Sequence, residues 1–192
     1  SVFTLNFIQN DSDSNFDADA YLGNLQLGTG QLTINASLSL LGQDNEGSAA
    51  SAFTDDGTIS LSGSGGVSIY SYDGENYSLD GILSTETTGT GTITLTGSGT
   101  FQGGALGQPE FRLSSVSGGA DGTSSTFDLD IYAGVFGIGG TGTVTVSGVV
   151  TAPTLYASTG TLVLSDGASL ADQVSNSSNN QGVLTFLGDG SV

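Results

Sequence analysis

Apolar and polar residues alternate in short runs along most of the chain. Residues 2–8 place Phe3, Leu5 and Phe7 on one side, with polar residues between them. This period of two is that of a β-strand with one buried face. The same alternation predicts further strands at residues 25–41, 58–71, 77–84, 90–101, 110–116, 126–136, 142–151, 154–164 and 182–187.

A short unit, in which a glycine is followed by two alternating apolar residues, recurs five times. It begins at Gly30, Gly57, Gly91, Gly142 and Gly160, so that the spacings are 27, 34, 51 and 18 residues. A solenoid or a propeller repeats at a fixed period. The unequal spacings therefore favour independent strands of a sandwich, each with apolar residues inward and Thr or Ser outward.

Turn and helix signals complete the prediction of the fold. Asp-Gly pairs, which supply the positive φ angles of tight hairpins, recur along the chain, and residues 72–77 form the clearest hairpin. Helical periodicity is nearly absent, and only residues 48–53 and 169–174 are candidates for a turn or two of helix. We therefore expect an all-β, antiparallel β-sandwich, jelly-roll-like and Gly/Ser/Thr-rich, over residues 20–192. Residues 1–19 precede it as an N-terminal strand and an acidic loop.

Composition and charge exclude several classes of function. The 192 residues contain 19 acidic side chains and a single basic one, Arg112, so the net charge is −18. Such a surface repels nucleic acids and anionic membranes, and no apolar run approaches the roughly 18 residues of a membrane-spanning helix. Without His, Cys or Lys, the usual catalytic bases and nucleophiles are missing. We expect no enzyme, no nucleic-acid binding and no membrane insertion.

Residues 11–19 form the most acidic segment, and oxygen-bearing side chains occupy every second position. They are Asp11, Asp13, Asn15, Asp17 and Asp19. Carboxylate and amide oxygens are the ligands that Ca²⁺ prefers. The segment opens like an EF-hand loop, but its sixth position is Phe16 rather than Gly and its twelfth is Leu22 rather than Glu. A calcium loop of another kind and a solvated acidic turn are the two interpretations, and Ca²⁺ is the only cofactor suggested.

The apolar strand at residues 2–8 carries a resemblance to a known class of proteins. The chain is similar in type to secreted β-sandwich subunits of pili, which join by donor-strand exchange. The resemblance implies that Phe3, Leu5 and Phe7 enter the sheet of a neighbouring copy, with residues 11–19 as the hinge. It also implies a homopolymer, with the chain as a structural subunit of an extracellular filament. The alternative is that this strand folds back into its own sheet.

Several features favour a secreted protein. The chain is acidic, lacks lysine and is rich in Gly, Ser and Thr. Its start at Ser1 fits the removal of a signal peptide, and it fits equally well a sequence that is part of a longer chain. Four N-x-S/T sequons permit N-glycosylation in that setting. Their acceptor residues are Asn10, Asn35, Asn76 and Asn176.

A second function also fits a secreted β-protein. A monomeric cell-surface adhesin, or a carbohydrate-binding module, would gather aromatic side chains on one loop or face. Tyr70, Tyr72 and Tyr77 cluster around the hairpin expected at residues 72–77. In that case the partner would be a carbohydrate rather than a copy of the chain.

Overall fold

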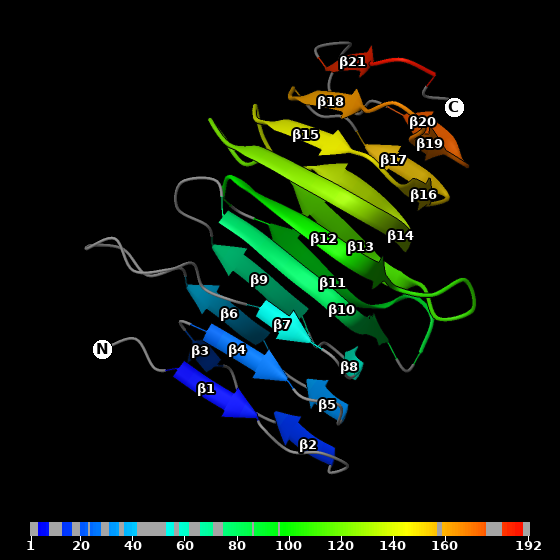
Figure 1. The fold of residues 1–192 in the computed structure, drawn as a ribbon. Coiled ribbons are helices and arrows are strands. Elements are labelled where there is room, and N and C mark those ends of the chain that lie inside the picture. The colour runs from blue at the N-terminus through cyan, green and yellow to red at the C-terminus, as the bar shows by residue number, and fades with distance from the viewer. Residues whose placement is uncertain are drawn as a thin grey trace.

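Every strand pair that the computed structural model describes is parallel, and the chain winds into a β-solenoid (Figure 1). The structure describes residues 83–85, 87–95, 97–153, 159–175 and 182–189 in full. It describes the backbone alone of residues 4–7, 13–16, 20–22, 24–27, 31–34, 37–41, 53–55, 58–61, 66–70, 75–82 and 154–156. No helix long and apolar enough to cross a membrane occurs within these ranges.

The solenoid has three sides, and each coil contributes to all three except the last, of which only β21 on side 1 is described. Side 1 consists of β1 (Thr4–Phe7), β4 (Asn24–Leu27), β7 (Phe53–Asp55), the first parts of β10 (Glu75–Thr85), β12 (Gly99–Leu106) and β14 (Ser124–Ile138), then β15 (Thr143–Val146), β18 (Thr161–Leu164) and β21 (Val183–Phe186). The first three of these strands form a small sheet of their own, and β7 lies against β10.

The other two sides follow the same order along the axis. Side 2 consists of β2 (Asp13–Phe16), β5 (Gln31–Ile34), β8 (Thr58–Leu61), later parts of β10, β12 and β14, then β16 (Val149–Thr151) and β19 (Ser169–Leu170). Side 3 consists of β3 (Ala20–Leu22), β6 (Ser37–Leu41), β9 (Gly66–Tyr70), β11 (Thr90–Leu95), β13 (Leu113–Gly118), the end of β14, β17 (Thr154–Tyr156) and β20 (Gln173–Ser175).

The core is the interior of the solenoid, built from columns of apolar residues in register. Phe101, Phe127, Val146 and Leu164 occupy one register column on side 1, and all four are fully buried. The ring of Phe127 also meets Phe136 of side 3 edge-on, with centroids 5.5 Å apart. Because alternate residues of each strand point inward, stacking the coils buries one column after another.

The outward columns of side 1 carry hydroxyl groups instead. Thr100, Thr126 and Thr145 share one register position, and none of them is fully exposed or buried. This register column is therefore neutral, although the exposed Asp128 lies on β14 in the same coils. The strands β12, β14 and β15 have ladder partners on both edges.

The expectation of an antiparallel sandwich is wrong, although the expectation of an all-β chain is confirmed. The hairpin at residues 72–77 is wrong as well, since β9 pairs with β6 and β11, whereas β10 pairs with β8 and β12. The helix candidate at residues 169–174 is occupied by β19 and the start of β20.

The coils of this solenoid differ in length, so the unequal spacings along the sequence do not exclude the fold. Paired strands of successive coils lie 18 residues apart at Thr143 and Thr161, but 29 apart at Leu38 and Val67. Loops of unequal length leave the strands in register, since only the strands must stack. The repeat units at Gly142 and Gly160 are neighbours on side 1, whereas the unit at Gly91 begins a strand of side 3.

Candidate functional site: the C-terminal end of the solenoid

The strand β21 is the last one described, and it continues side 1 by one further strand. It pairs in parallel with β18, with Leu184 opposite Leu162 and Phe186 opposite Leu164. Two backbone bonds border the ladder: the N–H of Val183 donates to the Gly160 carbonyl at 3.1 Å, and that of Leu187 donates to the Leu164 carbonyl at 2.8 Å.

The core columns reach the solvent at this end. Leu162 and Leu164 are fully buried, but their register partners Leu184 and Phe186 are 37% and 45% exposed. Val183 and Leu187 are each 52% exposed. Leu184 and Phe186 therefore extend two interior columns to a point where no described strand covers them, and their side chains reach the solvent.

The backbone of β21 is also open along its outer edge. In a parallel ladder, alternate residues bond to one neighbouring strand and the residues between them bond to the other. Val183 and Leu187 donate toward β18, so the amide groups of Leu184 and Phe186 face the outer side. Among the described residues no strand pairs with that side. An open edge beside exposed apolar residues is a template for another strand.

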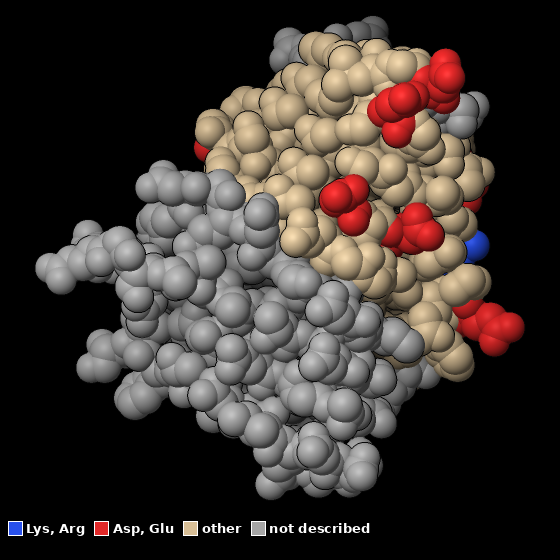
Figure 2. All heavy atoms as spheres, in the orientation of Figure 1, with Lys and Arg blue, Asp and Glu red and all other residues tan. Residues whose placement is uncertain are grey.

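The charges near this end are few and acidic. The N–H of Asp189 donates to Oδ1 of Asp166 at 3.0 Å, which links the last turn to the preceding coil. Figure 2 shows acidic side chains in separate groups, together with one basic group, on the otherwise uncharged surface of the described part. This end is therefore apolar along β21, with Asp166 and Asp189 at one corner and the exposed Asp172, between β19 and β20, at another.

Two other aspartates make bonds of the same kind between coils. Oδ1 of Asp121 accepts the N–H of Thr141 at 2.8 Å and its hydroxyl at 3.1 Å. These bonds stabilise the ionised form and lower the pKa of Asp121 below its usual 3.8. Oδ1 of Asp130 accepts the N–H of Val149 at 2.9 Å. Each carboxylate thus accepts hydrogen bonds from a corner residue of the following coil and links the two coils.

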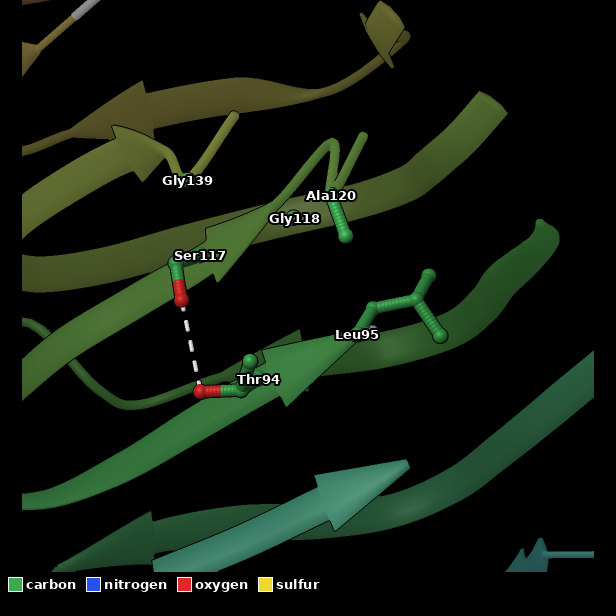
Figure 3. A pocket seen from close by; sticks show the side chains of 6 residues that line it. All are labelled: Thr94, Leu95, Ser117, Gly118, Ala120 and Gly139. Carbon is green, nitrogen blue, oxygen red and sulfur yellow. Dashed lines mark hydrogen bonds between the residues drawn. The ribbon is translucent and has the colours of Figure 1, made fainter. Parts of the chain in front are cut away.

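A small hollow lies beside the corner between sides 3 and 1 (Figure 3). It measures about 220 Å³ and is lined by Thr94, Leu95, Ser117, Gly118, Ala120 and Gly139. The hydroxyl of Ser117 donates to that of Thr94 at 3.3 Å. No ionisable side chain lines it, so it provides neither an acid nor a base.

The predicted calcium ligands are only partly described. Asp13 and Asn15 lie on β2, paired with Gln31 and Thr33 of β5, so this part of the expected loop is a strand. Asp11, Asp17 and Asp19 lie outside the described residues. Within the described ranges no three Asp, Glu, His or Cys residues come together as a metal site. Calcium binding by residues 11–19 stays a prediction.

The N-terminal strand predicted for self-assembly is β1. Its Leu5 and Phe7 pair with Leu25 and Leu27 of β4 in the same chain, whereas Phe3 lies outside the described residues. The folded chain therefore has the fold-back arrangement that the sequence left open. This pairing occupies one edge of β1, and no described strand pairs with its other edge.

The remaining predicted residues are scattered. The glycosylation candidate Asn76 lies on β10, opposite Thr100, and Asn10, Asn35 and Asn176 lie outside the described residues. Tyr70 ends β9 on side 3 and Tyr77 lies on β10 on side 1, so they belong to different sides of the solenoid, and Tyr72 is not described.

Sequence reasoning placed a strand at residues 182–187 but assigned no role to it. The pattern of β21 is that of a core strand, and nothing local distinguishes it from β15 or β18. No family model matches the chain, and no match was found among curated proteins or solved structures. The feature of the described structure that bears on function is the exposed apolar face of β21.

Proposed function

We propose that this protein is a structural subunit of an extracellular filament, and that it polymerises by β-strand addition at its ends. The observation that carries the proposal is the uncapped core at β21, where Leu184 and Phe186 are exposed in register with the fully buried Leu162 and Leu164.

Exposure of this kind is costly and favours association. Complete burial of a Leu or Phe side chain is worth about 1.5–3 kcal/mol, so covering the two partly exposed side chains would return roughly 1–2.5 kcal/mol. Backbone bonds to the open edge of β21 would add direction and register to this gain.

The solenoid also restricts where strands can be added. Most strands of the interior coils have ladder partners on both edges, although β7 has a described partner on one edge only. The strands β1, β2 and β3 in the first coil and β19, β20 and β21 in the last ones also have a described partner on one edge only. Contacts between two different ends repeat without closing, and they generate filaments. The remaining surface is neutral or acidic, with one basic residue in the chain, which suits a scaffold better than a catalyst or a nucleic-acid binder.

The mass of the particle in solution tests this function. Purified chain 1–192 is examined by sedimentation velocity and negative-stain electron microscopy, together with the double variant Leu184→Asp/Phe186→Asp. We expect rods from the unaltered chain and a species near 19.1 kDa from the variant, because two buried carboxylates would oppose end contacts.

Thr185→Asp is the matched control. It adds a charge to the same strand, but at the outward register position shared with Val163 and Thr145, so rods should persist. Far-UV circular dichroism verifies that all three chains keep their β-structure. If the unaltered chain is monomeric at every concentration, the proposal is wrong, and the adhesin or carbohydrate-binding alternative takes its place.

A further inference from the structure

The loop between β12 and β13 exposes an aromatic side chain. This Phe111 loop comprises residues 107–112, reads Gly-Gln-Pro-Glu-Phe-Arg and turns the corner from side 2 to side 3. Phe111 is 42% exposed, Glu110 is exposed and Arg112 is partly exposed. Apart from residues 183–187, only Phe111 and Val149 are exposed among the large hydrophobic residues with described side chains. Exposed apolar surface is therefore rare away from β21, and the Phe111 loop carries the larger of these two side chains.

The Phe111 loop projects beyond the coil that follows it. Leu106 and Leu113, which flank the loop, pair with Ile131 and Ala133 of β14. In β14 a single residue, Tyr132, lies between these partners, whereas the loop has six residues in the same place. The extra residues have no room within the ladder, so they extend outward from the corner.

Hydrogen bonds fix the backbone of the Phe111 loop to the preceding coil. The three consecutive carbonyl groups of residues 110–112 accept bonds from the hydroxyl of Thr88, the hydroxyl of Ser84 and the N–H of Gly89, in that order. The bond from Gly89 measures 2.8 Å. These bonds involve the backbone of the loop rather than its side chains. The loop therefore presents its side chains in a fixed arrangement, which lowers the entropy lost on binding.

The charges beside Phe111 complement one another. Glu110 precedes the aromatic residue, and Arg112, the single basic residue of the chain, follows it. Within the described ranges no carboxylate forms an ion pair with Arg112. A second copy of a chain with a net charge of −18 offers acidic or neutral surfaces almost everywhere. Only a contact that includes Arg112 can therefore be attractive in charge between two copies.

We propose that the Phe111 loop binds the same loop of a second copy across a two-fold axis. In a two-fold contact, whatever one copy presents to the other is returned by its partner. Phe111 would lie against Phe111, and Glu110 of each copy would face Arg112 of the other. This contact lies on the flank of the solenoid and does not involve β21, so it is independent of growth at the ends.

A contact between two short loops is small, and small interfaces are weak and transient. We therefore expect a dimer only at high protein concentration. Where many copies are aligned in two neighbouring rods, the same weak contact would be repeated and would hold the rods side by side.

Charge reversal tests the contact. Sedimentation equilibrium at high protein concentration measures dimerisation of Leu184→Asp/Phe186→Asp, in which the end at β21 is blocked, and each reversal is added to this chain. Glu110→Arg and Arg112→Glu each place like charges opposite one another, so each should weaken dimerisation at least about tenfold. Phe111→Ala should weaken it as well, because it removes the apolar centre of the contact.

Two combinations show whether the charges face each other. The double reversal Glu110→Arg/Arg112→Glu restores complementary charges with the opposite polarity and should dimerise like the unreversed chain. A mixture of the two single reversals should form a heterodimer, because one loop is then wholly acidic and the other wholly basic. Neither result follows from net charge, since the double reversal leaves the net charge unchanged.

Asp128→Arg is the matched control for Glu110→Arg. It makes the same change of charge at an exposed residue of β14 on side 1, and it should leave dimerisation equal or slightly stronger. Far-UV circular dichroism verifies that every chain keeps its β-structure.

The outcomes separate this contact from the proposed filament. Chains that stay monomeric at every concentration overturn the contact, and so does a dimer that the single reversals leave intact; the filament proposal, which depends on β21, is unaffected by either result. If the unaltered chain forms no rods but the reversals behave as expected, the filament is wrong and the loop contact stands.

Discussion

The sharpest stability prediction concerns Gly142, which lies at the corner before β15. A Cβ atom at this position would lie 2.7 Å from the carbonyl oxygen of Thr123 and 2.8 Å from the carbonyl carbon of Gly119, and closer still to the carbonyl oxygen of Ala120. All three atoms belong to the backbone of the preceding coil. Gly142→Ala therefore requires the backbone of one coil to move relative to the next.

The movement would disturb hydrogen bonds on both sides of the corner. The N–H of Gly142 donates to the Gly119 carbonyl at 3.1 Å, and its own carbonyl accepts the N–H of Thr161 at 2.9 Å. Overpacking in a rigid site costs about 1–3 kcal/mol, and a weakened backbone bond adds about 1 kcal/mol. We expect Gly142→Ala to lower the free energy of unfolding by about 2–4 kcal/mol.

Gly137→Ala is the matched control, since a Cβ atom there would meet nothing within 4 Å. The loss of chain entropy in the unfolded state should leave this variant equal to the unaltered protein or more stable by up to about 1 kcal/mol. Urea unfolding followed by circular dichroism measures both variants. With a slope of about 1–3 kcal/mol per molar urea, the midpoints should differ by at least about 0.7 M. Equal midpoints would refute the close packing of coils at this corner.

Two further predictions concern carboxylates. Because bonds from Thr141 lower the pKa of Asp121, its ionised form stabilises the fold above pH 3.8, and this contribution is lost as the pH falls through the lowered value. The melting temperature of Asp121→Ala should therefore lie below that of the unaltered chain at pH 7 and approach it near pH 2, whereas a constant difference would contradict the argument. Calcium bound by residues 11–19 should raise the free energy of unfolding by about 2.7 kcal/mol at a hundredfold excess over Kd, and the melting temperature should rise with it. A melting temperature that EDTA leaves unchanged would exclude the site.

The positions of most strands follow from the sequence alone. Alternation at residues 142–151, 154–164 and 182–187 predicted β-structure where β15 to β18 and β21 lie, because the period of side chains in a strand is a local property of the backbone. The first two runs were each predicted as one strand, whereas each contains a corner and two strands. The Asp-Gly pairs that end at Gly122 and Gly167 are turns as predicted, with φ angles of 73° and 79°. The pair at Asp80 instead lies within β10. The same turn can close a hairpin or turn the corner of a coil, and the sequence does not distinguish these uses.

The pairing of the strands was decided only by the tertiary structure. A strand with one buried face alternates in the same way whether its neighbour is antiparallel or one coil away and parallel, so Thr143 and Thr161 carry no local sign that they face each other. Paired strands lie 18 residues apart in one place and 29 in another. The difference is taken up by loops, whose length does not change which residues of the strands face each other. This freedom removed the fixed period by which a solenoid would have been recognised.

The candidate site shows the same division. From the sequence, Leu184 and Phe186 have the alternation of core residues, and the pattern correctly predicts a strand with an apolar face. Their exposure of 37% and 45% depends on whether another strand lies on the outer edge of β21, and that is set by where the coil stands in the stack. Burial is a property of neighbours distant in the chain, so local sequence determined the strand and only the stacking of coils determined that its apolar face is open.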